Sequence, residues 1–230
     1  GEMLFPRMLV AGHILNGAPM GMYATVLRSV AEARAEVQRQ KALGYDYIKV
    51  HNAVPAILYD AIAAEARAQG LWLVGHVPHD ITVAHAIRNG HRTMEHLKGY
   101  LNDRTLEISQ EDWAQATKGA DIWNVPTLSA TRQFLRGDAA KKILESEQPL
   151  YLSPFDREQW KQAANAPVRP VHAAQAAKMR DIVRRLLPVH DRFVAGTDSG
   201  GGYVFALSGF ALHDELESLR EAGLTNAQAL

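Results

Sequence analysis

The chain of 230 residues contains no cysteine. This absence excludes disulfide bonds, zinc sites built from thiolates and a cysteine nucleophile, and it leaves the redox state of the compartment open. A metal ion bound by this chain therefore has to be held by nitrogen and oxygen ligands.

An excess of charge is also missing, because 25 basic residues balance 25 acidic ones and the formal net charge is zero. The totals give no indication of nucleic acid, an anionic membrane surface or a polyanionic substrate. No apolar run approaches the roughly 18 residues of a membrane helix. We expect a small-molecule or short-peptide substrate, no nucleic acid and no membrane, and we leave a homo-oligomer open.

An initiator methionine is missing as well, since the chain begins Gly-Glu-Met-Leu-Phe and stops at Leu230 within a helix-favouring run. We therefore expect both ends to be cut from a longer protein. The first residues lack the basic, apolar and small-residue order of a signal peptide. If the chain is cut from a longer protein, as we expect, this absence carries no information. The composition is typical of a soluble protein, and the sequence indicates no compartment.

Three short segments rich in Ile, Val, Leu, Tyr or Trp dominate the first half, at Tyr45–Val50, Leu71–Val77 and Arg92–Leu97. Helix-favouring stretches, Pro55–Gln69 and Thr82–Asn89, separate them. Strands that alternate with helices are typical of a parallel sheet, and side chains at the carboxyl ends of parallel strands point toward a shared site. The pattern predicts an α/β fold with a functional site at these strand ends.

The remaining elements follow the same reading. Met8–Leu15, Asp121–Leu128 and Arg192–Gly196 are predicted as strands; Ser29–Leu43, Ser109–Gly119, Val171–Leu187 and Gly209–Ala222 are predicted as helices. The segment from Ser129 to Pro170 is predicted as a helical excursion on the rim. Because no repeat, low-complexity tract or linker interrupts the chain, we expect one domain over residues 1–230.

His76 and His96 lie at the ends of two of the predicted strands. A buried histidine is more often a hydrogen-bonded core residue than a ligand. Two histidines at corresponding positions on adjacent strands, however, can direct both imidazoles to one ion, and histidine is the commonest neutral metal ligand. The spacing predicts a metal site.

Asp198 follows a predicted strand directly and precedes Ser199 and three glycines. One interpretation is a turn, since Asp and Gly favour turns for backbone reasons. The other is a carboxylate held at the edge of the sheet, where it binds metal and accepts a proton from an attacking water. The position straight after an apolar strand favours the second interpretation.

Lys49 ends the apolar run Tyr-Asp-Tyr-Ile-Lys-Val. A buried ammonium has to be paired or neutralised, so Lys49 either extends to the surface, forms an ion pair with Asp46 or Asp60, or loses its charge. A neutral lysine amine can add carbon dioxide and become a carbamate, an anionic oxygen ligand. These alternatives stay open at this point.

Short motifs spread over nearly the whole chain resemble the amidohydrolase superfamily, and most closely its imidazolonepropionase-like branch, which includes Xaa-Pro dipeptidases. The motifs are Tyr-Ile-Lys-Val around Lys49, Val-Gly-His-Val-Pro around His76, Met-Glu-His-Leu around His96, Val-Pro-Thr-Leu at 125–128, Gly-Thr-Asp-Ser-Gly around Asp198, and Leu-His-Asp-Glu-Leu-Glu followed by Glu-Ala-Gly-Leu-Thr. Each motif alone is weak, but together, in this order and spacing, they are specific.

The resemblance implies a metal-dependent (β/α)8 barrel of the TIM type with ligands at the strand ends. It assigns Lys49 as an N-carboxylated lysine that bridges two divalent metal ions, zinc in our prediction, with His76, His96 and Asp198 as further ligands. A hydroxide shared by the ions would attack a carbonyl, and Asp198 would accept its proton and pass it to the leaving group.

The chain departs from the family pattern in one respect, because members carry a His-x-His pair on the first strand and none occurs here. We expect an incomplete barrel that lacks the first strands and the small β-sandwich, so the chain alone would bind metal incompletely and be inactive. A catalytically dead barrel that serves as a binding module is the alternative.

The resemblance implies a metal-dependent amidohydrolase that cleaves a C–N amide or peptide bond in a dipeptide or an N-acyl amino acid. A cyclic-amide or lactone hydrolase using the same site remains an alternative. His51, His79 and Tyr203 lie close to proposed ligands in sequence and are predicted to contact substrate. His213 opens the last helix and is predicted to orient a ligand.

Overall fold

The computed structural model describes residues 7–101, 112–167, 169–200 and 203–230. The chain forms two compact units. Of the described residues, the first unit comprises 7–101 and 112–123, and the second comprises 124–167, 169–200 and 203–230. None of the described helices is long and apolar enough to cross a membrane.

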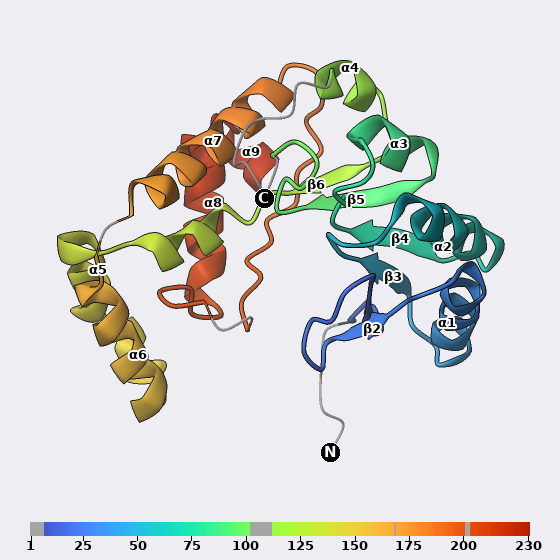
Figure 1. Cartoon of the computed structure of the whole chain (residues 1–230). Coiled ribbons are helices and arrows are strands. Elements are labelled where there is room, and N and C mark those ends of the chain that lie inside the picture. Colours follow the sequence, from blue (N-terminus) through green and yellow to red (C-terminus); the bar gives the residue numbers. More distant parts are fainter. Residues whose placement is uncertain (1–6, 102–111, 168, 201–202) are drawn as a thin grey trace. The chain divides into compact units, whose positions relative to one another are not determined.

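A parallel sheet forms the centre of the first unit (Figure 1). Its strands are β1 (Ile14–Asn16), β2 (Ala24–Val26), β3 (Tyr47–Val50), β4 (Trp72–Gly75) and β5 (His91–Glu95). Strand order is β2-β1-β3-β4-β5-β6, and each pairing from β2 to β5 is parallel. Strand β6 (Trp123–Val125) begins at the last residue of the first unit. Because all carboxyl ends of a parallel sheet face the same way, residues after β3, β4 and β5 share one edge.

The helices of the first unit start and stop where local sequence signals place them. They are α1 (Val30–Ala42), α2 (Ala56–Ala68), α3 (Val83–Arg88) and α4 (Trp113–Thr117). The hydroxyl of Ser29 accepts a hydrogen bond from the backbone N–H of Glu32, and Thr82 caps α3 in the same way. Gly44 follows α1 with a φ of +85°, a left-handed conformation that glycine adopts without strain.

The core of the first unit lies where α2 and α3 cover the sheet, and Figure 1 places α1, α2 and α3 along one side of the strands. Its buried apolar side chains come from strands and helices alike: Leu15, Ile48, Val50, Leu58, Ile62, Leu73, Val83 and Met94. Burying such side chains stabilises the fold by about 1.5 to 3 kcal/mol each. The strands whose ends carry the candidate site are therefore held in place by a packed core.

The second unit is mostly helical. After β6 it contains the 3-10 helices η1 (Leu128–Phe134) and η2 (Gln148–Tyr151) and the helices α5 (Gly137–Leu144), α6 (Pro154–Asn165), α7 (Pro170–Leu186), α8 (Phe210–Glu221) and α9 (Asn226–Ala229). A cluster of Ala140, Ile143, Trp160, Ala164 and Phe205 packs α5 and α6 together.

Two motifs of the resemblance meet inside the second unit. Glu215 on α8 is fully buried, and its carboxylate accepts a 2.6 Å hydrogen bond from the backbone N–H of Ser129, just after Val-Pro-Thr-Leu. One residue earlier on α8, Asp214 forms a 2.8 Å ion pair with Arg132. Helix α8 therefore binds η1, the 3-10 helix that follows β6, at two points.

The open sheet with helices in its crossovers confirms the predicted incomplete barrel. Several predicted elements are shorter than expected. The first strand covers only Ile14–Asn16, and Arg192–Gly196 forms a single bridge between Phe193 and Asn124 instead of a strand. The start of the predicted segment Ser109–Gly119 lies outside the described residues. The expectation of one domain over residues 1–230 stays a prediction.

Candidate metal centre

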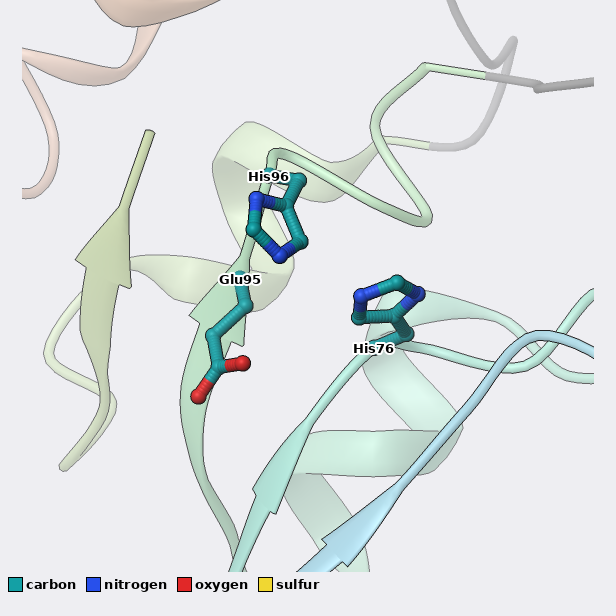
Figure 2. A group of neighbouring side chains, drawn as sticks. All are labelled: His76, Glu95 and His96. Carbon is teal, nitrogen blue, oxygen red and sulfur yellow. The ribbon is translucent and has the colours of Figure 1, made fainter. Parts of the chain in front are cut away.

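The carboxyl ends of β4 and β5 bring three possible metal ligands together (Figure 2). His76 follows β4, Glu95 is the last residue of β5 and His96 follows it. One ligand atom from each side chain lies within 4.8 Å of the others. The rings of His76 and His96 meet edge to face, with centroids 4.8 Å apart. Among the described residues, this group is the one whose atoms converge in the manner of a metal site.

Glu95 and His96 reach the same space although they are neighbours in sequence. Successive side chains of a strand point to opposite faces. Strand β5 ends at Glu95, however, and His96 has a φ of +58°, in the left-handed region. Non-glycine residues adopt this conformation rarely and at a cost of about 1 to 3 kcal/mol, and such residues cluster at functional sites. The strained backbone at His96 thus turns its ring toward the carboxylate of Glu95.

His76 is the most buried member of the group, with 6% of its surface exposed. Burial and the neighbouring His96 and His51 rings lower the pKa of His76 far below its usual range. The imidazole is therefore neutral near pH 7, as a metal ligand has to be. Its Nδ1 lies 2.7 Å from the side-chain oxygen of Asn52.

Lys49 projects from β3 next to the same group. Its Nζ lies 2.8 Å from Glu95 Oε2, and the hydroxyl of Thr93 donates a 3.3 Å hydrogen bond to Glu95 Oε1. Gly75 leaves room for this arrangement, because a Cβ there would lie 2.4 Å from the Val50 carbonyl oxygen and 3.1 Å from Lys49 Cγ. The charge of Lys49 is therefore balanced within the sheet edge itself.

Asp46 and Asp60, the ion-pair partners that the sequence suggested for Lys49, interact with other groups. Asp46 accepts a 2.8 Å hydrogen bond from the backbone N–H of Val10, and Asp60 lies 2.6 Å from His85 Nε2. Of the alternatives that the sequence left open for Lys49, the structure shows an ion pair, but with Glu95 on β5 instead of Asp46 or Asp60. The carboxylation of Lys49 stays a prediction.

The donor set fits a zinc ion. Two neutral imidazoles and a carboxylate are the nitrogen and oxygen ligands that zinc binds in sites without cysteine. Lys49, 24% exposed, balances the Glu95 carboxylate without itself being a ligand in this arrangement. The chain's own residues thus provide three donors from one unit.

Asp198 lies in the second unit, where its backbone also adopts a left-handed conformation, with a φ of +53°. The hydroxyl of Tyr203 donates a hydrogen bond to the Asp198 carboxylate. Burial and this carboxylate raise the pKa of Tyr203 to about 12, so the hydroxyl keeps its proton near pH 7. The two residues that sequence analysis assigned separately therefore form one hydrogen-bonded pair.

The other predicted residues divide by position. His51 follows β3, and its ring lies 4.1 Å from that of His76, centroid to centroid. His79 is exposed, and its backbone N–H donates to the carbonyl oxygen of Asn52. His213 is exposed on α8, beside Asp214. Substrate contacts of His51, His79 and Tyr203 and a ligand-orienting role of His213 stay predictions.

Comparison with solved structures identifies proteins of similar fold. Neither a family model nor a curated protein sequence matches the chain. Among solved structures, bottromycin amidohydrolase matches with a TM-score of 0.76 and 26% identity, over 98% of this chain and 53% of its own. A Xaa-Pro dipeptidase with methionine in its active site matches with a TM-score of 0.58 and 20% identity, over 89% and 45%. A prolidase complexed with N-methylphosphonate-L-proline matches with a TM-score of 0.51 and 19% identity, over 90% and 45%.

The chain shares its fold with the amidohydrolases. The resemblance inferred from the motifs is thereby confirmed, and the proteins of similar structure include amidohydrolases and prolidases. The chain spans about half the length of these amidohydrolase-type structures.

Sequence analysis missed two residues at the candidate metal centre, Glu95 and Asn52. Glu95 stood inside the quoted motif Met-Glu-His-Leu, but successive side chains of a strand point to opposite faces, so the sequence does not place Glu95 beside His96. Asn52 lies just beyond β3, and an asparagine in a loop is typical of a turn. In both regions, the available signal was a polar residue near the carboxyl end of a predicted strand.

Proposed function

We propose that the chain is part of a metal-dependent amidohydrolase that cleaves a C–N amide or peptide bond in a small substrate. The observation that carries the proposal is the convergence of His76, Glu95 and His96 at the carboxyl ends of β4 and β5. Active sites of (β/α)8 barrels lie at this end of the strands.

His76 and His96 would hold a zinc ion, with Glu95 as the third donor present in the first unit. The resemblance adds Lys49, as a carboxylated bridge, and Asp198 as ligands of a pair of ions. When bound, the metal would polarise the scissile carbonyl and lower the pKa of the attacking water. The carboxylation of Lys49 requires that its ammonium loses a proton and leaves Glu95.

Asp198 is the general base in this proposal. It takes one proton from the attacking water and delivers it to the nitrogen of the leaving amine, so the carboxylate ends the reaction as it began. The hydrogen bond from Tyr203 orients the Asp198 carboxylate. Tyr203 keeps its own proton throughout, because its pKa is about 12.

The substrate class that we propose is a dipeptide or an N-acyl amino acid. The structures that match the chain include a Xaa-Pro dipeptidase and a prolidase with a proline-containing phosphonate, which supports small peptides over large ones. A cyclic amide or a lactone is the second candidate, since the same residues would act on either carbonyl. The resemblance also implies a His-x-His pair among the ligands, and none occurs in residues 1–230.

The test uses the full-length protein loaded with zinc and a panel of dipeptides, N-acyl amino acids, cyclic amides and lactones. We expect turnover of a dipeptide or an acyl amino acid and about two metal ions per chain. Asp198→Asn should lower kcat by roughly 100-fold or more, the usual contribution of a general base, with folding intact. Lys49→Ala should also abolish turnover.

Asp138→Asn is the matched control, because Asp138 is almost fully exposed on α5. This variant should keep the wild-type rate. Normal turnover by Asp198→Asn or by Lys49→Ala would refute the assigned roles. An upstream sequence without His-x-His, together with no hydrolysis of any substrate, would instead favour the non-catalytic barrel.

A further inference from the structure

The side chain of Asn52 faces His76 from the turn that follows β3. Its Oδ1 lies 2.7 Å from His76 Nδ1, a short hydrogen bond. Asn52 belongs to none of the motifs quoted from the sequence. It nevertheless contacts His76, the most buried imidazole of the metal centre, and could therefore control how that imidazole binds a metal.

The backbone around Asn52 is fixed on both sides. The N–H of His79 donates a 2.9 Å hydrogen bond to the carbonyl oxygen of Asn52, and the N–H of Ala53 donates a 3.0 Å hydrogen bond to the side chain of Asn16. Asn16 is itself buried and donates to the carbonyl oxygen of Ala18. The turn therefore presents the Asn52 amide to His76 in one defined position.

A neutral imidazole carries its proton on one nitrogen only, so its hydrogen-bond partner decides which nitrogen is left to bind a metal. An amide oxygen accepts and cannot donate. Its approach to Nδ1 therefore requires a proton on Nδ1 and leaves the lone pair on Nε2. With the amide turned over, its NH2 group would donate to Nδ1 and the proton would move to Nε2, where it would block coordination.

We propose that Asn52 is a positioning residue that holds His76 in the Nδ1–H form and directs the unprotonated Nε2 toward Glu95 and His96. The inference rests on the metal centre proposed above. Partners of this kind, which orient a metal-ligating histidine through its second nitrogen, typically account for 10- to 100-fold in metal affinity.

The first test needs no variant. Long-range nitrogen–proton NMR correlations of the metal-free chain report which nitrogen of His76 carries the proton. We expect the Nδ1–H pattern for His76. An Nε2–H pattern would overturn the proposal, whatever the chain's affinity for zinc. This measurement therefore separates a failure of the Asn52 role from a failure of the metal site.

The second test compares zinc affinity across variants by calorimetry, with folding checked by amide NMR spectra. Asn52→Leu, which has no acceptor, should weaken zinc binding by roughly 10- to 100-fold and mix the two His76 tautomers. Asn52→Asp, which only accepts, should keep the Nδ1–H form and stay within about threefold of wild type, below the usual effect of losing such a partner. Equal zinc affinity in folded Asn52→Leu and wild type would overturn the proposal. If Asn52→Leu does not fold, the comparison of Asn52→Asp with wild type and the NMR tautomer decide it.

Discussion

The ammonium of Lys49 on β3 lies 2.8 Å from the carboxylate of Glu95 on β5, and β4 lies between these two strands in the sheet. Glu95 is at the same time one of three converging metal donors. One carboxylate therefore serves two purposes: it neutralises a half-buried cation, and it offers an oxygen to an ion held by His76 and His96. A change in the charge of Lys49 therefore changes the electrostatic potential at the metal centre.

The first prediction concerns the strength of this ion pair. Lys49→Met leaves the Glu95 carboxylate, 17% exposed, without its cation, and Glu95→Gln leaves Lys49 without its anion. Because the pair is partly buried, we expect each single change to lower the free energy of unfolding by about 1 to 2 kcal/mol. The double variant should lose less than the sum of the two, by about 1 kcal/mol.

Urea unfolding of the four proteins in this double-mutant cycle measures the coupling. The exposed pair of Arg185 and Asp181 on α7 is the matched control, with side chains 56% and 41% exposed. Its coupling should be about 0.3 to 0.5 kcal/mol, the usual value for such helix pairs. If the losses in the free energy of unfolding caused by Lys49→Met and Glu95→Gln add up to that of the double variant, the ion pair contributes nothing to stability.

The second prediction concerns carboxylation of Lys49. A carbamate on Lys49 would place a second anion beside Glu95, and like charges at this distance repel unless a cation lies between them. With carbon-13 bicarbonate, we therefore expect an NMR carbamate signal from the zinc-loaded chain and none from the metal-free chain. Lys49→Ala should remove the signal. A carbamate on metal-free wild-type protein would contradict the role assigned to Glu95.

The third prediction concerns acid stability and depends on His91. Its Nε2 donates to the carbonyl oxygen of Gly75 at 3.3 Å, so its Nδ1 accepts the hydroxyl of Tyr59 at 3.0 Å. Burial lowers the pKa of His91 from 6.5 to about 4. Between these values the unfolded chain binds more protons than the folded one, so stability falls as the pH drops.

Integrated from pH 7 to pH 5, His91 should contribute a loss of about 2 kcal/mol in the free energy of unfolding. His91→Gln removes the titrating group, so the variant should be less stable at pH 7 but lose less stability on acidification. His13→Gln, at an exposed position, should behave as wild type. Urea unfolding at the two pH values measures the difference, and equal losses in wild type and His91→Gln would rule out this role.

Much of the sheet edge was predictable from local sequence. Helix starts at Ser29 and Thr82 and the helix stop at Gly44 follow from capping preferences, which act within a few residues. His76 and His96 were predictable as a pair because both follow apolar segments that form parallel strands.

The positions of Glu95 and of the Lys49–Glu95 ion pair could not be predicted, because they depend on backbone conformation and strand register, which local sequence patterns do not reveal. Alternation along a strand separates Glu95 from His96, and only the left-handed backbone at His96 brings both side chains into one site. The pairing of Lys49 with Glu95 required the alignment of β3, β4 and β5. Arg192–Gly196 has a strand-like composition, but its partner β6 has three residues, and one bridge forms.

The most direct test of the metal centre is a zinc titration of the 230-residue chain followed by calorimetry. His76→Ala and His96→Ala remove two of the three converging donors, whereas His85→Ala removes an imidazole that pairs with Asp60 on the helical side of the sheet. We predict one equivalent of zinc bound by wild type and by His85→Ala, and binding at least roughly tenfold weaker in the other two variants. Absence of zinc binding by the folded wild-type chain, or equal affinity in all four proteins, would contradict the account.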